Sequence, residues 1–194
     1  MSITAPDPSF RAIPDLVREH AAARPHHAAL VQGDECLDYG ALDSLMDRVA
    51  AALQRDGVRP GDSIAICAHS APRYAAVFLG ALRAGVAVAP LAPSVTAEQF
   101  ASMLGDSQAR LLFADEAAQP LLQGVELRTI ALNASLPGTT LDDWLAAPLT
   151  RPEAVTLQPE WPFNIIYSSG TTGTPKGIVQ SHGMRWGHIQ RAAI

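Results

Sequence analysis

The residues best suited to chemistry in this sequence lie in one short run, residues 167–177, which contains the only lysine of the chain. Every other member of the fourteen Lys and Arg residues is an arginine. The two cations differ, because lysine carries a compact charge on a flexible stem whereas arginine presents a flat fork of donors. Lys176 therefore places a mobile point charge in a run rich in glycine and hydroxyl residues. Such a charge is suited to holding a polyphosphate and then releasing it.

The neighbours of Lys176 supply the other groups that a phosphate site needs. Three glycines let the backbone approach a ligand closely, and they are Gly170, Gly173 and Gly177. Successive backbone N–H groups in such a loop can form an anion-binding concavity. Five residues add hydroxyl donors: Ser168, Ser169, Thr171, Thr172 and Thr174. The ligand predicted is a phosphate chain, most simply that of ATP with Mg²⁺. The alternative is a polar turn that binds nothing, but this combination directly after an apolar strand favours phosphate binding.

The standard glycine motifs do not fit this run. A Walker A motif begun at Gly170 fails at Pro175, where glycine is required, and at Gly177, where Ser or Thr is required. The dinucleotide pattern GxGxxG does not occur here. A GxSxG nucleophile elbow fails because no glycine stands two residues before either serine. Ser168 and Ser169 are therefore not predicted to be nucleophiles.

Apolar runs and helical spacing predict the elements that must position this loop. Short apolar runs predict strands at residues 28–31, 35–39, 63–68, 86–91, 110–114, 125–132 and 163–167. Helical periodicity and helix-end residues predict helices at residues 14–23, 41–55, 72–84, 96–106, 115–122 and 142–147. A last helix is expected to start near His182, after an extended segment at 178–180. Residues 137–162 are rich in Pro and polar residues and predict a surface connection.

The order of these elements predicts the fold class. Strands that alternate with helices of about ten to fifteen residues indicate βαβ units, and hence an α/β fold with a parallel-rich sheet flanked by helices. Ligands on such sheets gather at the carboxyl ends of the strands. The loop after Tyr167 is expected at that edge. The helix at 96–106 is expected to be capped by Ser94 or Thr96.

The composition argues against several classes of function. The chain has 194 residues, a net charge of −5 and no basic stripe, so nucleic acid is not a predicted partner. Residues 1–11 lack the basic and apolar regions of a signal peptide. No stretch reaches the ~18 apolar residues of a membrane span. Cys36 and Cys67 are isolated, and we interpret them as reduced, packed thiols. These features predict a cytoplasmic protein.

The run 167–177 resembles the signature loop of the adenylate-forming superfamily, with eleven consecutive matching positions. This superfamily includes acyl-CoA synthetases, 4-coumarate–CoA ligase, firefly luciferase and the adenylation domains of nonribosomal peptide synthetases. Three upstream segments are similar to other family segments in the same order: 37–42, 57–62 and 79–85, the last followed by Pro90 and Leu91. The resemblance covers nearly the whole chain.

The resemblance implies ATP-dependent activation of a small-molecule carboxylic acid, followed by transfer of the acyl group to the thiol of coenzyme A. The positions that match the family's phosphate contacts are Ser168, Ser169, Gly170, Thr171, Thr172, Gly173 and Lys176. Ser168 also matches a position associated with Mg²⁺ in some members. A threonine at position 171 leans toward the acyl-CoA synthetases. Two alternatives remain open: an enzyme that loads the phosphopantetheine of a carrier protein, and a nucleotide-binding fragment without catalysis.

The resemblance also implies a longer parent protein. In this family the carboxylate pocket, the adenine contacts and the catalytic lysine of a mobile C-terminal domain all follow the signature loop. We therefore expect residues 1–194 to be the N-terminal portion of the AMP-binding domain, and inactive alone. The catalytic residues are expected beyond Ile194. We interpret His182 as structural, and His26 and His27 as facing solvent or lying in a linker.

Overall fold

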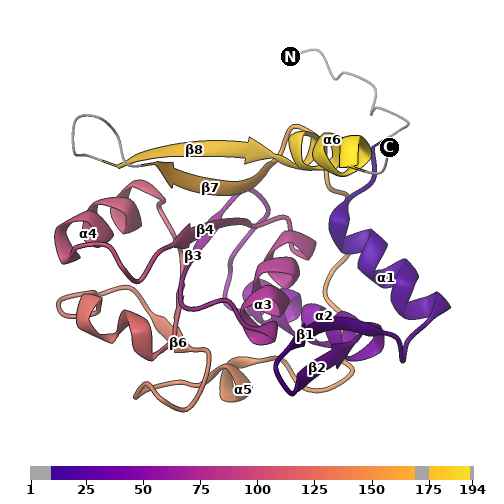
Figure 1. The fold of residues 1–194 in the computed structure, drawn as a ribbon, viewed down its shortest axis with the longest axis horizontal. Coiled ribbons are helices and arrows are strands. Elements are labelled where there is room, and N and C mark those ends of the chain that lie inside the picture. Colours follow the sequence, from indigo (N-terminus) through magenta and orange to yellow (C-terminus); the bar gives the residue numbers. More distant parts are fainter. Residues whose placement is uncertain (1–9, 169–174, 193–194) are drawn as a thin grey trace.

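The computed structural model describes residues 10–168 and 175–192. Within these residues the main sheet has six strands (Figure 1). The strand order is β6-β5-β3-β4-β7-β8. The strands are β3 (Ser63–Cys67), β4 (Ala87–Leu91), β5 (Leu112–Ala114), β6 (Thr129–Ala131), β7 (Pro162–Ser168) and β8 (Lys176–Ser181). Neighbouring strands are parallel throughout, except that β8 runs antiparallel to β7. The parallel-rich sheet predicted from the sequence is confirmed.

Helices cover both faces of this sheet. One face packs against α2 (Tyr39–Arg55), α3 (Pro72–Arg83) and the short helix α5 (Leu141–Trp144). The other face packs against α4 (Ala97–Asp106) and the 3₁₀ helix η1 (Glu116–Leu121). In β3, Ile64 and Ile66 enter the first core cluster, whereas Ala65 and Cys67 enter the second. Burial on both faces explains why such strands read as continuous apolar runs.

The helix ends follow local signals in the sequence. Thr96 caps α4, accepting a hydrogen bond from the backbone N–H of Gln99, whose side chain accepts a bond from the Thr96 backbone in return. Of the two caps predicted, Thr96 is therefore the correct one. Close packing of α2 on α3 depends on Gly80, because a Cβ at this position would lie 2.6 Å from the Cβ of Val49.

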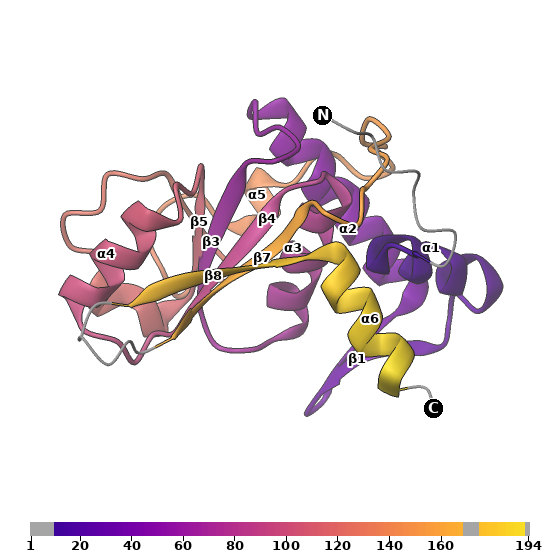
Figure 2. The ribbon, with the colours of Figure 1, turned by 90° about the horizontal axis from the view of Figure 1, so that it is seen from above.

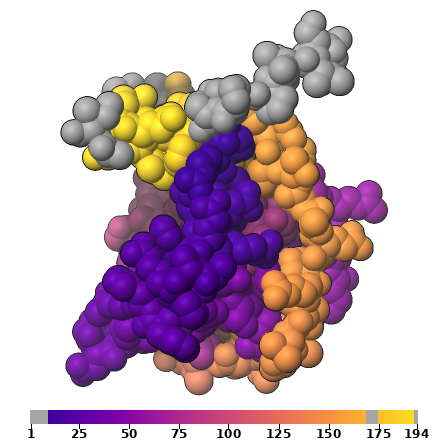
Figure 3. Space-filling model, turned by 90° about the vertical axis from the view of Figure 1, so that its right-hand side faces the viewer, coloured from indigo at the N-terminus to yellow at the C-terminus, as the bar shows by residue number. Residues whose placement is uncertain are grey.

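The N-terminal elements pack on the outer side of α2 and α3. They are the helix α1 (Ile13–Ala23) and an antiparallel hairpin of β1 (Ala28–Gln32) and β2 (Glu35–Asp38), turning at Gly33 as predicted. Val17 of α1 and Leu42 of α2 share a small apolar cluster there. The connection that leads to β7 runs over the surface beside α1 (Figure 3). The side chain of Gln54 holds it through two hydrogen bonds to the backbone of Glu153, 3.0 and 2.8 Å long.

The helix expected at 142–147 is the shorter α5, Leu141–Trp144, and the strand expected at 110–114 is the shorter β5, Leu112–Ala114. Two other predicted elements differ more from the structure. The strand expected at 125–132 is reduced to Thr129–Ala131. Val125 and Leu127 are apolar because they pack against the core cluster under α4, not because they join a strand ladder. The helix expected at 115–122 is a 3₁₀ helix with Pro120 inside it, and proline cannot donate the hydrogen bond that an α-helix interior requires.

One cysteine prediction was wrong. Cys36 is exposed, because β2 belongs to the outer hairpin and not to the main sheet. Cys67 is buried as expected, and this burial raises the pKa of its thiol to about 12. None of the helices in the described ranges is long and apolar enough to cross a bilayer.

Candidate functional site

The predicted phosphate loop joins the two strands of the hairpin β7–β8. The antiparallel register pairs Tyr167 with Gly177 and, one step further, Ser168 with Lys176. The two ends of the loop are therefore neighbours across the hairpin. Both Ser168 and Lys176 are exposed, and neither side chain forms a hydrogen bond or ion pair with another described residue.

The remaining predicted phosphate contacts lie outside the described residues. These positions are Ser169, Gly170, Thr171, Thr172 and Gly173. The structure thus brings together the first and last of the predicted site residues, Ser168 and Lys176. The assignment of the others remains a prediction.

The hairpin leaves the main sheet soon after it begins. β7 runs parallel to β4, in keeping with the parallel-rich sheet that was predicted, but the two strands pair at a single register position, Val88 with Asn164. Figures 1 and 2 show β7 and β8 continuing past the central strands toward α4. The strand expected to be buried along 163–167 is buried only at Phe163 and Asn164. The loop therefore begins over α4, a position that the strand order did not predict.

Tyr167 attaches the end of β7 to the last turn of α4. Its hydroxyl donates to Oδ2 of Asp106 at 2.7 Å and lies 3.1 Å from the carbonyl oxygen of Met103. Partial burial, together with the hydrogen bond and negative charge of Asp106, raises the pKa of the Tyr167 phenol well above its ordinary value of 10. The phenol therefore stays protonated and remains a donor at neutral pH.

Side chains alternate between the two faces of the hairpin. Ile165, Tyr167 and Val179 lie on the face that turns toward α4 and its surroundings. The opposite face carries three cross-strand pairs: Asn164 with Gln180, Ile166 with Ile178, and Ser168 with Lys176. This face changes from buried to exposed along its length. Asn164 is 4% exposed, whereas Ile178 is 50% exposed. The hydroxyl and the ammonium thus stand at its open end.

Some polar atoms at the buried end of this face have no partner. Oδ1 of Asn164 and Oε1 of Gln180 are buried without a hydrogen bond from any described residue. The same holds for Nε2 of His182, the first residue of α6 (His182–Ala192). The His182 ring packs edge-on against Phe163, with centroids 5.2 Å apart. Burial lowers the pKa of His182 to about 4, so the ring is neutral near pH 7. This placement agrees with the structural role expected for it.

A cavity of about 310 Å³ lies beneath the hairpin. It is bounded by the starts of β3 and β4, the end of α4 and the inner face of the hairpin. Its lining residues include Asp62, Asp106, Ser107, Gln108, Ile165 and Val179.

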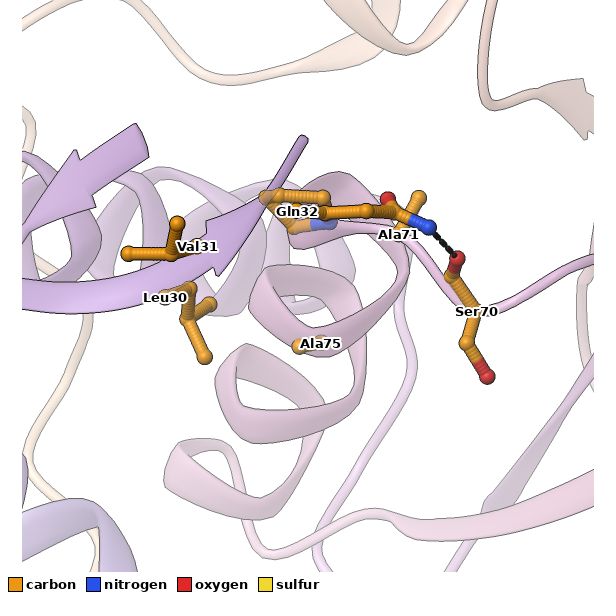
Figure 4. Close-up of a pocket in the computed structure, with 7 residues that line it drawn as sticks. Leu30, Val31, Gln32, Ser70, Ala71 and Ala75 are labelled. Atoms are coloured by element: carbon orange, nitrogen blue, oxygen red, sulfur yellow. Dashed lines mark hydrogen bonds between the residues drawn. The ribbon is translucent and has the colours of Figure 1, made fainter. Parts of the chain in front are cut away.

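A second pocket, of about 250 Å³, lies between β1 and the start of α3 (Figure 4). Leu30, Val31 and Ala75 contribute to its largely apolar lining, and Gln32 donates from Nε2 to the carbonyl oxygen of Ser70 at 2.8 Å. No charged side chain lines this pocket among the described residues, so it is a poor candidate for binding phosphate.

The described residues offer little for a metal ion on their own. No group of three or more His, Cys, Asp or Glu side chains within them is arranged to hold one. A magnesium ion at the predicted position would take its ligands chiefly from phosphate oxygens and water, as Mg²⁺ commonly does. Ser168 is the residue that the sequence predicted to lie beside Mg²⁺, and it is exposed at the end of β7.

Sequence reasoning missed Asp106. Its position at the polar end of a predicted helix gave no sign of a contact with the hairpin, because the contact joins residues 61 positions apart. The one local clue is Gly177, where a Cβ would lie 2.9 Å from Oδ2 of Asp106. A glycine at this position does not by itself indicate which residue packs against it, so the contact could not be predicted from the sequence.

Comparison with known proteins identifies the family. The family described as AMP-binding enzyme matches residues 17–187. The chain therefore belongs to the AMP-binding, adenylate-forming enzymes, as the signature loop predicted.

The curated relatives are much longer proteins. One component of the linear gramicidin synthase of Brevibacillus parabrevis is 33% identical over 175 residues, which cover 90% of this chain and 3% of that protein. The fatty acid–[acyl-carrier-protein] ligase ScoC of Streptomyces coeruleorubidus is 29% identical over 176 residues, covering 90% of this chain and 34% of that protein. The chain thus spans about a third or less of these two relatives.

Solved structures share the fold. An anthranilate CoA ligase, AuaEII, in complex with anthranoyl-AMP superposes with a TM-score of 0.81 at 23% identity, covering 91% of this chain and 36% of that chain. VinN in complex with L-aspartate superposes with a TM-score of 0.75 at 26% identity, covering 89% of this chain and 48% of that chain. The predicted fold class, a parallel-rich α/β part of an adenylate-forming domain, is confirmed.

Proposed function

We propose that this chain is the portion of a longer adenylate-forming enzyme that holds the phosphates of ATP. The observation that carries the proposal is the pairing of Ser168 with Lys176 at the open end of the β7–β8 hairpin. Both side chains are exposed on one face of the hairpin, and Lys176 has no carboxylate partner among the described residues. An unneutralised ammonium beside a hydroxyl fits a polyanionic ligand.

The reaction is the activation of a carboxylic acid. A carboxylate oxygen attacks the α-phosphorus of ATP, and the bond to the β-phosphate oxygen breaks, which gives an acyl-adenylate and pyrophosphate. Negative charge accumulates on the departing pyrophosphate. Lys176 and Ser168, together with the predicted contacts at 169–173, would stabilise that charge with groups already in place. Mg²⁺, when bound with ATP near Ser168, would neutralise further phosphate charge.

Coenzyme A is the proposed acceptor in a second step, in which its thiol displaces AMP from the acyl-adenylate. A carrier-protein phosphopantetheine is the second candidate, because the relatives include a fatty acid–[acyl-carrier-protein] ligase and part of a gramicidin synthase. Both acceptors present a thiol to the same adenylate. Supplying the full-length enzyme with coenzyme A alone, and then only with a carrier protein that bears a free phosphopantetheine thiol, separates the two by the thioester formed. A cytoplasmic location is part of this proposal.

The first test is carboxylate-dependent exchange of pyrophosphate into ATP by the full-length parent protein. The panel of acids should span those named in the comparisons: aromatic acids such as anthranilate, amino acids such as aspartate, and fatty acids. Exchange with one class supports adenylation and names the substrate class. The chain 1–194 is run alongside, and we expect no exchange from it. Binding of MgATP without exchange by either form would favour the non-catalytic alternative.

Lys176→Ala in the full-length parent should slow this exchange by about 10²-fold, as for loss of one preorganised stabilising group. Lys176→Arg should restore only part of the rate, because a flat fork of donors does not reproduce a point charge. Arg73→Ala is a matched control, since it removes an exposed cation whose partner is Asp142. An unchanged rate for Lys176→Ala would remove this residue from the phosphate site.

A further inference from the structure

The end of α4 contacts both strands of the hairpin at one point. Oδ2 of Asp106 accepts from the hydroxyl of Tyr167 on β7 at 2.7 Å. The same oxygen would lie 2.9 Å from a Cβ built on Gly177 of β8, so it sits directly against the backbone there. Tyr167 and Gly177 are cross-strand partners, and the next pair along is Ser168 with Lys176. Asp106 therefore touches the hairpin one residue pair before the groups proposed to hold phosphate.

Asp106 is not itself placed to bind phosphate. It lies on the α4 side of the hairpin with Tyr167, whereas the Ser168 and Lys176 side chains stand on the opposite face, as strand alternation requires. Its charge also has no ion-pair partner among the described residues. A hydrogen bond to an ionised acceptor is roughly twice as strong as one between neutral groups. The carboxylate is thus suited to holding the phenol.

Few backbone hydrogen bonds join this end of the hairpin to the rest of the sheet. β7 pairs with β4 at one register position only. Ile165 and Tyr167 pack against the core cluster on the α4 side, but between them and the starts of β3 and β4 the hairpin borders the cavity of about 310 Å³, which Ile165 and Val179 help to line. Where few contacts hold a segment, each remaining contact has more influence on its orientation. Among the described residues, the hydrogen bonds from Tyr167 to the last turn of α4 are the polar side-chain contacts that hold the hairpin beyond the cavity.

We propose that Asp106 is a positioning residue, which sets the orientation of Ser168 and Lys176 by fixing Tyr167 and the backbone at Gly177. This inference rests on the proposed function for its effect on ATP. Asp106 acts only through the hairpin, so its loss should alter the use of ATP and leave the affinity for the carboxylic acid unchanged.

The kinetic test uses Asp106→Ala, Asp106→Asn and Tyr167→Phe in the full-length enzyme, alone and combined, assayed by ATP–pyrophosphate exchange. Asp106→Ala and Tyr167→Phe should each lower kcat/KM for ATP about tenfold, the size expected for one hydrogen bond to a charged group. The KM for the acid should not change. Asp106→Asn should lose less, since an amide oxygen can still accept from the phenol. The double variant Asp106→Ala/Tyr167→Phe should lose no more kcat/KM for ATP than either single variant, because both single substitutions remove the same hydrogen bond.

Asp62→Ala is the matched control, because Asp62 lines the same cavity but bonds the backbone of Arg59 and not the hairpin. It should keep the wild-type kcat/KM for ATP. Additive losses in the double variant, an equal effect on the acid, or an equal loss from Asp62→Ala would each overturn the proposal.

Amide hydrogen exchange tests Asp106 without any assay of activity. In Asp106→Ala, the backbone amides of β8 (Lys176–Ser181) should exchange faster, whereas those of β3 and β4 should not. Unchanged protection of β8 would overturn the proposal. If the wild-type enzyme shows no pyrophosphate exchange with any acid, the proposed function fails, and the amide measurement still decides the role of Asp106.

Discussion

Buried charges between α1, α2 and α3 have hydrogen-bond partners, whereas several buried polar side-chain atoms of β7, β8 and α6 have none among the described residues. In the first region Asp47, only 4% exposed, accepts from Arg83 at 2.8 Å and from Arg18 at 2.6 Å. Arg151 approaches from the surface connection to 3.2 Å. Arg83 in turn also bonds Asp43. We call these five residues the closed cluster.

In the second region, which we call the open hairpin, the register that builds the candidate site also leaves atoms unsatisfied. Oδ1 of Asn164, Oε1 of Gln180 and Nε2 of His182 are buried without partners among the described residues. Large apolar side chains are exposed beside them, including Ile178 at 50% and Val179 at 55%.

The two regions differ in what their polar groups do: those of the closed cluster hold the fold together, whereas those of the open hairpin lie beside the candidate site. Buried polar groups in proteins are nearly always hydrogen-bonded, so a group of exceptions needs an explanation. The closed cluster links α1, α2 and α3 to the surface connection, and each of its five charged side chains has an oppositely charged partner within it. The open hairpin carries the candidate site, and places where a chain departs from the rules of stability tend to be functional. Three predictions test this contrast.

The largest effect is expected from breaking the closed cluster. Asp47→Ala leaves Arg83 buried with Asp43 as its remaining carboxylate, and loss of one partner of a buried ion pair is strongly destabilising. We expect the free energy of unfolding of the chain to fall by about 3 kcal/mol, measured by urea denaturation. Asp142→Ala, which breaks the exposed pair with Arg73, should have a much smaller effect. Similar losses from both variants would mean that the closed cluster does not differ from a surface ion pair.

An intermediate, pH-dependent effect is expected from His182. Its pKa is about 4 in the folded chain and about 6.5 when exposed, so below pH 6.5 the unfolded state takes up a proton that the folded state does not. The stability contribution is therefore complete above pH 6.5 and is lost as the pH falls toward 4, by at most about 1.4 kcal/mol per pH unit.

His182→Gln should remove this part of the slope. The measurement is the urea midpoint from pH 4.5 to 7.5, compared with the wild type and with the exposed-site control His188→Gln. If wild type and His182→Gln show the same pH dependence, the ring is not buried as a neutral group.

The smallest effect is expected from Asn164, and its sign is opposite. Asn164→Leu replaces a buried amide whose oxygen has no partner by an apolar side chain of similar shape, so the free energy of unfolding should rise by about 1 kcal/mol. The matched control is Asn133→Leu, because Asn133 donates to Glu116 at 2.9 Å and should give no gain. A loss of stability at Asn164 would show that its amide is satisfied, and the contrast with the closed cluster would weaken.

The strands at the centre of the sheet were predictable from the sequence, whereas the bounds of the outer elements and the contacts between distant residues were not. The strands around Ile64 and Val88 were predictable because burial on both faces makes each of them a continuous apolar run. Glycines and segments with helical spacing mark where these runs end. The strand expected at 125–132 failed because an apolar residue such as Leu127 looks the same whether it packs in a loop or joins a ladder. Arg83 gave no sign of its ion pairs, because its partners Asp43 and Asp47 are 40 and 36 positions away.

The sequence by itself determined the family, the alternation of strands and helices, and the chemistry of residues 167–177, because these properties depend on residue types at short, fixed spacings. It also predicted Lys176 and Ser168 as site residues. Only the tertiary structure decided that the hairpin passes over α4 and that Asp106 accepts a hydrogen bond from Tyr167, 61 positions away. The same is true of the burial of Oδ1 of Asn164 and Nε2 of His182 without a hydrogen bond from any described residue. These features depend on which surfaces meet in space, and no local pattern of side chains encodes that meeting.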